Sequence, residues 1–234
     1  MGDCLFMRKG AIHMAPLVLK SAFADNTWAE IVQACHTNRI PDTWVVGDSL
    51  MMDIGGTAYQ INIIGKNHDD YADGSGKAPL TFQLRDCYNE LNSMNSSSTN
   101  VGGWKSSRMR TTHLPAIMSL MPPEVQGGIR EVNKLTSKGS ANSAIETTSD
   151  KLFLLSEVEI RGVISDSFAG EGSRYEYYKG KSSVKYFAGT ANSWWTRSPR
   201  SVYNTQFCHM NTGNNSASIA SANSALGVAF AFCF

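Results

Sequence analysis

The sequence predicts an α+β fold, in which helices and strands are mixed along the chain rather than alternating as β–α–β units. An early segment has apolar residues at helical spacing, and a later one alternates apolar and polar residues as a strand does. The last part of the chain holds short strand-like runs separated by turn residues. With 234 residues and 42% hydrophobic content, the chain can form a sizeable core.

The N-terminal part is predicted to contain a lead-in and then one helix. Residues 1–20 are interpreted as an extended lead-in or attachment segment, and residues 21–234 as a single domain. Asn26 is predicted to cap the helix, because an Asn side chain accepts hydrogen bonds from the free N–H groups of a first turn. The apolar positions that share one face of this helix are Trp28, Ile31, Val32 and Cys35.

A β-hairpin is predicted next. Two extended runs, residues 43–54 and 57–65, flank the pair Gly55-Gly56, and the second run alternates apolar with polar residues. A polar loop at residues 66–78 separates the hairpin from a brief strand at Leu80–Leu84.

The middle of the chain is predicted to hold short helices and strands joined by polar segments. Residues 104–121 have a helical pattern, which Pro115 is expected to break. The other expected segments are a surface loop at 92–100, a helical piece from Pro122-Pro123, a strand at 130–136, a polar linker at 137–149, a compact strand at 151–155 and a short turn capped by Ser156.

The C-terminal stretch differs from the rest of the chain because no residue after Arg200 has a charged side chain. Nine of the fourteen residues from 211 to 224 are Asn, Ser or Thr, a composition that cannot form a core by itself. This stretch is bracketed by apolar residues with strand-like spacing, which are Trp194, Trp195, Val228, Phe230 and Phe232. The pattern therefore predicts a β frame that presents a polar, uncharged recognition surface, with a plain solvated loop as the alternative.

Short motifs stand in order on both sides of this stretch. The C-terminal ones are Trp194-Trp195-Thr196-Arg197-Ser198-Pro199 and Gly227–Phe234. The upstream ones are Gly47-Asp48, residues 63–70, Asn100-Val101-Gly102-Gly103-Trp104, residues 107–110 and residues 150–156. Together they resemble the variable proteins of diversity-generating retroelements, in the form found in phages and prophages of gut bacteria. The resemblance covers the chain from about Trp28 onward.

This resemblance implies a C-type-lectin-like fold, related to that of the formylglycine-generating enzymes, with short helices and twisted antiparallel strands. It also implies that a reverse transcriptase rewrites adenines late in the gene, so that Asn codons become codons for residues such as Ser, Thr, Tyr, His and Ile. The variable segment is then about 200–226, and Gly227–Phe234 is its fixed end. The implied ligand-binding positions are Ser201, Tyr203, Asn204, Thr205, His209, Asn211, Thr212, Asn214, Asn215, Ser216, Ser218, Ile219, Ser221 and Asn223. The implied frame residues are Trp194, Trp195, Arg197, Phe230 and Phe232.

The function expected from this surface is non-enzymatic binding of a cell-surface protein or glycan, in phage tropism or adhesion. Single contacts would be weak, which favours a homo-oligomer or multivalent display on a virion tail fibre or a similar extracellular display. The alternative is a structural component of a phage particle or an adhesin with an invariant C-terminal loop. An oxidase-like enzyme on the same fold is a third interpretation, but it needs a cysteine pair that the sequence does not show, so no catalytic residue and no cofactor are expected.

Composition bears on other functional classes and on where the protein is made. A net charge of +1 gives no electrostatic reason to expect nucleic-acid binding. No apolar run is long enough to insert into a membrane, and the start lacks a signal-peptide pattern, so synthesis in a bacterial cytoplasm without a signal peptide is expected. The scattered cysteines are expected to be buried free thiols, with a Cys208–Cys233 disulfide as the alternative.

Three smaller features leave alternatives open. The loop with His68-Asp69-Asp70 suits either a calcium site or a hydrogen-bonded loop, and its spacing does not match an EF-hand, so no metal site is predicted. Arg197 and Arg200 suit either contacts at the rim of the surface or ion pairs within the frame. The tyrosines that either border the site or cover the sheet are Tyr175, Tyr177 and Tyr178.

Adjacent residues of a strand point to opposite faces, which limits how the tryptophan pair can be used. At most one of Trp194 and Trp195 is therefore expected to face a ligand, and the other is expected to pack in the core.

Overall fold

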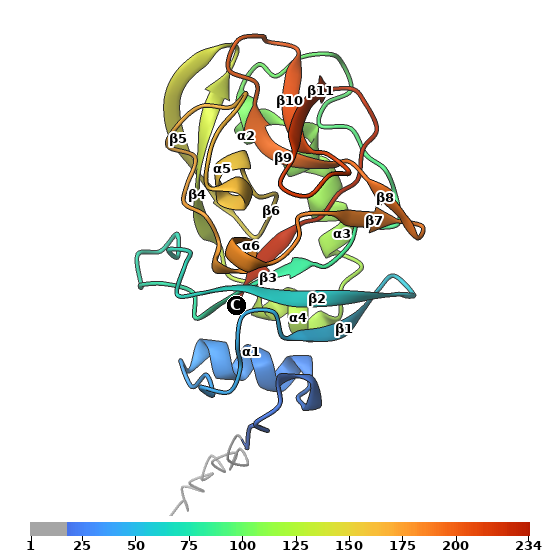
Figure 1. Ribbon diagram of the computed structural model, residues 1–234. Helices are drawn as coiled ribbons and strands as arrows, with labels where there is room; N and C mark the ends of the chain where they lie inside the picture. The colour runs from blue at the N-terminus through green and yellow to red at the C-terminus, as the bar shows by residue number, and fades with distance from the viewer. Residues whose placement is uncertain (1–17) are drawn as a thin grey trace, which may run out of the picture.

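The computed structural model describes residues 18–234, so the lead-in predicted for residues 1–20 lies almost entirely outside the described residues. Short helices and small antiparallel sheets are mixed along the described chain, which confirms the α+β class (Figure 1). The more specific C-type-lectin-like assignment stays a prediction.

The helical segments are all short. They are η1 (Phe23–Asp25), α1 (Trp28–His36), α2 (Gly103–Ser106), the π-helical turn η2 (Met109–His113), α3 (Leu114–Met118), α4 (Pro123–Gly128), α5 (Glu157–Arg161) and α6 (Glu176–Gly180). The strands are β1 (Ser49–Ile54), β2 (Thr57–Lys66), β3 (Leu80–Leu84), β4 (Val132–Gly139), β5 (Asn142–Asp150), β6 (Leu152–Phe153), β7 (Lys185–Phe187), β8 (Thr190–Asn192), β9 (Trp194–Pro199), β10 (Gln206–Met210), β11 (Ala217–Ser221) and β12 (Ala231–Cys233).

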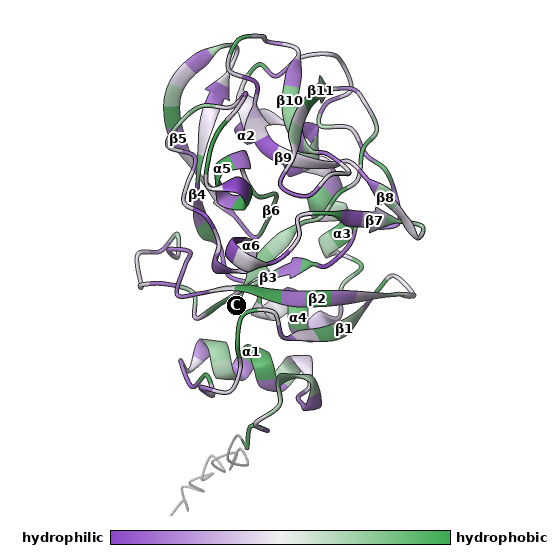
Figure 2. Ribbon diagram, viewed as in Figure 1, coloured by the Kyte–Doolittle hydropathy of each residue, from purple (hydrophilic) through white to green (hydrophobic). Residues whose placement is uncertain are grey.

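Helix α1 forms where the apolar spacing predicted it, but its N-cap is Thr27 and not Asn26. The Thr27 side chain accepts from the Glu30 N–H, and the Glu30 carboxylate accepts from the Thr27 N–H, which makes a complete capping box. The Asn26 side chain is buried instead, and its amide nitrogen donates to the backbone oxygens of Lys20 and Ala22. In Figure 2, hydrophobic and hydrophilic residues alternate around α1, as expected for a helix with one buried face.

A five-stranded antiparallel sheet, in the order β1-β2-β3-β12-β6, forms the centre of the molecule. The predicted hairpin and the Leu80–Leu84 strand are its first three strands, but the first run is a strand only from Ser49 and not from residue 43. The C-terminal strand β12 lies between β3 and β6, so the end of the described chain is an interior strand. One hydrophobic cluster extends from Phe23 to Phe234, which ties the N-terminal helix to the last strand.

The polar linker predicted for residues 137–149 is wrong, because this segment completes a hairpin of β4 and β5. Most side chains of β5 point to solvent, so the strand needs few apolar residues. The turn is made by Ser140 and Ala141, both with positive φ, and it lacks the Asn-Gly or Asp-Gly pair that signals such turns in sequence.

The helical stretch after Trp104 is broken at Ser107, and not at Pro115 as predicted. Ser107 has an extended backbone and ends α2, whereas Pro115 lies in the first turn of α3. Proline has no N–H to donate, and a π-helical turn precedes it, with the Leu114 N–H bonded to the Met109 oxygen.

Strands β9, β10 and β11 form a second sheet, in the order β11-β10-β9. This sheet lies at the opposite end of the molecule from α1 and from residue 18 (Figure 1). The predicted variable segment consists of β10, β11 and the loops beside them, so it occupies one end of the fold.

Candidate ligand-binding surface

The predicted ligand-binding positions fall into three groups by exposure. The exposed positions are Tyr203, Asn204, Thr212, Asn214, Asn215 and Asn223. The half-buried positions are Ser201, Thr205, Asn211, Ser216, Ser218, Ile219 and Ser221. His209 alone among them is buried. The loop at 201–205 and the turn at 211–216 therefore supply most of the accessible side chains.

His209 is not available as a ligand contact, contrary to the prediction. Its side chain is 8% exposed, packs edge-on against Trp195, and shares a hydrogen bond of 3.1 Å with its own neighbour's oxygen at Met210. Burial lowers the pKa of His209 and so favours the neutral ring. His209 therefore belongs with the frame residues.

Neither tryptophan of the pair faces solvent. Both indoles are fully buried, and each N–H has a backbone acceptor. Trp194 donates to the Ser183 oxygen at 3.0 Å, and Trp195 donates to the Asn92 oxygen at 2.8 Å. The pair anchors β9 in the interior below the surface.

Arg197 is a buried frame residue and not a rim contact. Its guanidinium forms two hydrogen bonds with the Glu159 carboxylate of α5. The remaining donors bind backbone oxygens of Leu135, Leu154 and Glu171, so strand β9 is joined to β4, to the residue that follows β6 and to α5 around one charge.

Lys134 extends this network under a cleft of about 620 Å³. Its ammonium contacts Asp69 at 2.7 Å, Glu159 at 2.8 Å and the Tyr175 hydroxyl at 3.1 Å, so all three of its N–H groups have acceptors. Burial alone would raise the pKa of Asp69, but Lys134 outweighs burial and lowers that pKa to about 2. The floor of the cleft is therefore saturated by its own ion pairs.

The acidic loop is held by these and similar pairs, which favours the hydrogen-bonded alternative over the calcium site. Asp69 is buried against Lys134, Asp70 pairs with Lys77 at 2.8 Å, and Asp73 binds Arg130 at 2.6 Å. Between residues 18 and 234, no group of three His, Cys, Asp or Glu side chains could hold a metal ion.

Glu171, whose backbone oxygen binds Arg197, has a carboxylate that is only partly paired. Its carboxylate is fully buried, and while Oε1 accepts the Ser137 N–H at 2.8 Å, Oε2 has no hydrogen-bond partner. Burial raises the pKa of Glu171 to about 7, although Arg197 opposes the rise. This group therefore changes charge near neutral pH.

The loop at 201–205 rests on Asn100, which is fully buried. The Asn100 amide nitrogen donates to the backbone oxygens of Tyr203 and Gln206, both at 2.8 Å, and its N–H donates to the Asn204 oxygen. The amide oxygen accepts from Ser140 at the β4–β5 turn. The motif around Asn100 thus holds the loop by its main chain and does not use the loop side chains.

The turn at 211–216 is held in a similar way. Arg161 donates to the Asn215 backbone oxygen at 3.1 Å, and the Asn215 N–H donates to the Ser183 hydroxyl at 2.7 Å. Asn214 differs, because its side-chain oxygen accepts the Ser183 N–H at 2.9 Å. Asn214 therefore has a structural role besides its exposure.

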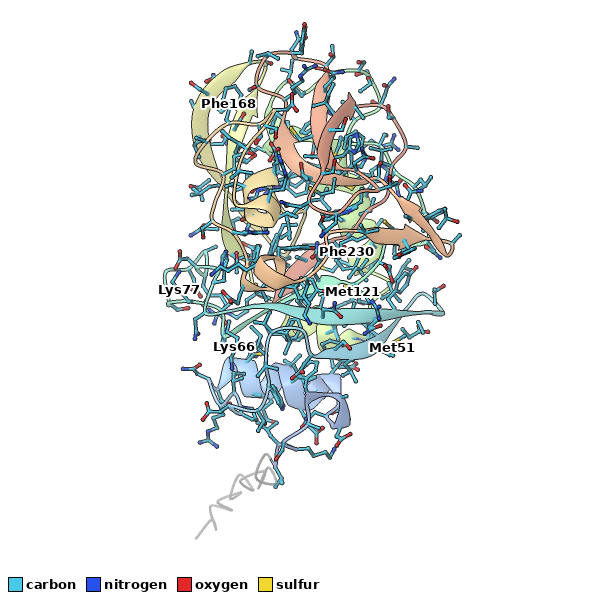
Figure 3. The ribbon with its side chains drawn as sticks, viewed as in Figure 1. Met51, Lys66, Lys77, Met121, Phe168 and Phe230 are labelled. Atoms are coloured by element: carbon cyan, nitrogen blue, oxygen red, sulfur yellow. The ribbon has the colours of Figure 1, made fainter. Side chains whose placement is uncertain are left out.

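Sequence reasoning missed the loop at 162–168, which borders the loop at 201–205. The buried carboxylate of Glu157 fixes this loop by accepting from Ser165, Asp166 and Ser167. The Asp166 oxygen accepts the Ser201 N–H at 2.7 Å, which joins the loop to the predicted segment. Figure 3 places Phe168, at the end of this loop, in the part of the molecule that holds β9–β11.

Two exposed aliphatic residues, Val163 and Ile164, lie on that loop. They are consecutive, which is the one sequence signal that could have found them, since exposed loops are normally polar. With the exposed Val202 and Tyr203 they give the surface a small apolar part.

The tyrosines cover the central sheet instead of bordering the surface. Tyr175 and Tyr178 are buried, and their hydroxyls bind Asp69 and Gln83. The half-buried Tyr177 accepts from Asn62 of β2.

The cysteines in the described part of the chain, Cys35, Cys87, Cys208 and Cys233, are free and buried, as expected, so the alternative of a Cys208–Cys233 disulfide is wrong. Cys4 lies outside the described residues.

Comparison with known families identifies one match. Residues 80–234 match the family model described as Domain of unknown function (DUF6273). The chain belongs to the DUF6273 family. The DUF6273 match begins at β3 and includes the whole candidate surface, whereas β1 and β2 of the same sheet precede it. No curated protein and no solved structure matches the chain. Within the described residues, no helix is long and apolar enough to cross a membrane.

Proposed function

We propose that this DUF6273 protein is a non-enzymatic ligand-binding protein with a C-type-lectin-like fold, whose segment from about 200 to 226 is diversified by a retroelement. Its target is a cell-surface protein or glycan, and a phage or prophage particle displays it in several copies. The surface consists of the loop at 201–205, the turn at 211–216 and the exposed parts of β11.

The observation that carries this proposal is how the segment is attached. Its anchors outside the segment are mostly bonds to main-chain groups: Asn100 binds the 203–206 backbone, Asn95 donates to the Ala222 oxygen, and Arg161 donates to the Asn215 oxygen. Main-chain bonds do not depend on side-chain identity. A segment attached in this way tolerates changes at its exposed positions, which repeated diversification requires.

The network below the surface supports the same proposal. Arg197, Glu159 and Lys134 join β9, α5 and β4 through buried, mutually satisfied charges. Such a network fixes the position of the frame strand while the loops above it vary.

The first test compares two exposed side chains at opposite ends of the molecule. Tyr203 is 56% exposed on the surface, and Met51 is 53% exposed on β1 near the N-terminal end. Fluorescent full chain is titrated onto a panel of bacterial strains, and the strain that binds best is used for the variants. We expect Tyr203→Ala to weaken binding by roughly tenfold, as loss of an aromatic contact does, and Met51→Ala to leave it unchanged. Equal binding by both variants would contradict the assigned surface.

The second test addresses diversification. The 3′ end of the gene is sequenced in a natural host population and scored codon by codon. We expect variation at adenine positions between codons 200 and 226, with the codons of Gly227–Phe234 constant. An invariant segment would leave the structural particle or adhesin component as the better interpretation.

A further inference from the structure

A second recess adjoins the proposed surface. A cleft of about 270 Å³ lies between the C-terminal end of α6 and the turn at 211–216. Its walls combine residues outside the predicted variable segment with two residues inside it, Asn214 and Asn215. The cleft is therefore lined both by residues that the proposed function expects to be constant and by residues that it expects to vary.

The constant wall is cationic. Arg174, Lys179 and Lys181 all line the cleft, and no Asp or Glu does. Lys179 is paired with Glu176 at 2.6 Å. Arg174 and Lys181 have no ion pair with any residue from 18 to 234, so the cleft keeps uncompensated positive charge although the adjoining segment has none.

Arg174 is held in place by two hydrogen bonds, and its other N–H groups have no acceptor among the described residues. Its Nε donates to the Ile160 oxygen at 3.0 Å and its Nη2 donates to the Tyr178 oxygen at 2.5 Å. These bonds use two of the five N–H groups of the guanidinium and neutralise none of its charge. A fixed guanidinium with free N–H groups is a group that binds phosphate and carboxylate well.

The variable wall adds uncharged donors. The oxygen of the Asn214 amide is held by the Ser183 N–H, and the amide nitrogen of this exposed residue has no acceptor among the described residues. The exposed Ser182 hydroxyl also lines the cleft. Amides and hydroxyls of this kind bind sugar hydroxyl groups, whereas protein partners are usually anchored by exposed apolar and aromatic side chains.

We propose that this cleft binds an anionic, hydroxyl-bearing unit of a cell-surface polysaccharide, with Arg174 and Lys181 as constant contacts to its phosphate or carboxylate. The residues at 214 and 215 then select among such units by their side chains. This inference rests on the proposed function, because it names the chemistry of the target that the surface recognises.

Binding of small probes to the full chain tests the cleft. Glycerol phosphate and glucuronate are titrated separately while amide shifts are followed by NMR, with glycerol as the uncharged reference. We expect at least one of the two anions to shift resonances around Ser183 and Asn215, glycerol to have no effect, and added salt to weaken binding. Which anion binds more tightly distinguishes a phosphate-bearing from a uronate-bearing polymer.

Two lysine variants separate a site from general surface charge. Lys181 and Lys138 are both exposed, but only Lys181 lines the cleft. We expect Lys181→Gln to weaken anion binding roughly fivefold and Lys138→Gln to change it little, because the interaction of unit charges falls with distance and screening. Equal weakening by both variants, or no binding of either anion, would show that the cleft is not an anion-binding site.

Failure of the cleft and failure of the proposed function give different results. If Tyr203→Ala weakens cell binding but neither anion competes with cells for the chain, the proposed surface is correct and the polysaccharide assignment is wrong. If Lys181→Gln weakens anion binding while Tyr203→Ala leaves cell binding intact, the cleft is an anion-binding site and the proposed surface is wrong.

Discussion

Arg197 determines how the frame strand sits in the molecule. It lies within the motif that begins at Trp194-Trp195, and its guanidinium binds Glu159 and three backbone oxygens without contact to solvent. A buried charge is tolerated only while its partners are all present. A lysine at this position keeps the charge but has three N–H groups instead of five and no planar geometry.

We therefore expect Arg197→Lys to lower the free energy of unfolding by about 1–3 kcal/mol, the cost of leaving buried acceptors without their hydrogen bonds. Urea unfolding followed by tryptophan fluorescence measures this change. Arg39→Lys, at an exposed position, is the matched control and should change little. A loss below about 1 kcal/mol at Arg197 would show that the network is not needed for stability.

Glu171 gives a prediction about pH. Its pKa in the folded chain is raised to about 7 by burial, from a usual value of 4.5. The folded state therefore holds the proton more tightly than the unfolded state, so the stabilisation is complete below pH 4.5 and is lost as the pH rises through about 7. Glu171→Gln imitates the protonated side chain at every pH.

Relative to the original chain, Glu171→Gln should have similar stability at pH 5 and be more stable at pH 8 by on the order of 2–3 kcal/mol, since one pKa unit corresponds to about 1.4 kcal/mol. Thermal or urea unfolding at both pH values measures the difference. A difference that is the same at pH 5 and pH 8 would contradict the raised pKa.

At the scale of elements, the terminal strand and the loops beside it have opposite roles. Every residue from 227 to 234 is buried, whereas most side chains from 201 to 205 and from 211 to 216 have solvent access. Gly227 marks the boundary, because a Cβ there would lie 2.4 Å from the Cys87 sulfur and 3.0 Å from the Ser193 oxygen. Under the proposed function, this close contact would mark the end of the variable segment.

Phe230→Ala should therefore lower the free energy of unfolding by about 3–5 kcal/mol, as expected for a fully buried Phe. Ser216→Ala and Asn223→Ala should each change it by less than about 0.5 kcal/mol, because the Asn223 side chain accepts only from the nearby Ser221 hydroxyl, in an exposed hydrogen bond, and the Ser216 side chain has no hydrogen bond among the described residues. Thermal melts of the three variants rank them. The reverse ranking would show that the segment, and not the strand, is structural.

The sequence predicted the elements whose signals are local. The hairpin around Gly55-Gly56, the Leu80–Leu84 strand and the Ser156 cap all formed, because apolar alternation and capping chemistry act within a few residues. The β4–β5 hairpin was missed because its outer strand is polar and its turn uses Ser140 and Ala141.

For the candidate surface, the sequence predicted the segment but not the exposure of each residue in it. His209 is polar and yet buried, because β10 is the middle strand of its sheet. Two sets of contacts could not be found from periodicity in the sequence. Asn100 binds residues 203–206, which are distant in the chain, and Glu157 binds residues 165–167 only because the loop between them folds back.

At the scale of the whole molecule, the candidate surface and the first described residues lie at opposite ends (Figure 1). The central five-stranded sheet separates them. An attachment near residue 18 would therefore leave the loops at 201–205 and 211–216 directed away from whatever the chain is attached to.

Bulky labels at the two ends should have different effects. Single cysteines at Met51 and at Tyr203, in a Cys4→Ser background, are coupled to the same large maleimide. The cysteines of the described chain are buried, and burial raises the pKa of the Cys35, Cys87, Cys208 and Cys233 thiols, so these should react slowly. We expect the label at position 203 to abolish cell binding and the label at position 51 to preserve it. Loss of binding with both labels would contradict a surface confined to one end.

Strand β12 follows the variable segment in the chain and inserts between β3 and β6. The ribosome must therefore translate the whole segment in frame before the central sheet can close. A chain that ends early, at a stop codon within the segment, lacks this interior strand and leaves apolar surface of β3 and β6 open to chaperones and proteases. Under the proposed function, folding would act as a proofreading step for diversification, since only a chain whose message is read intact past codon 226 could complete the sheet.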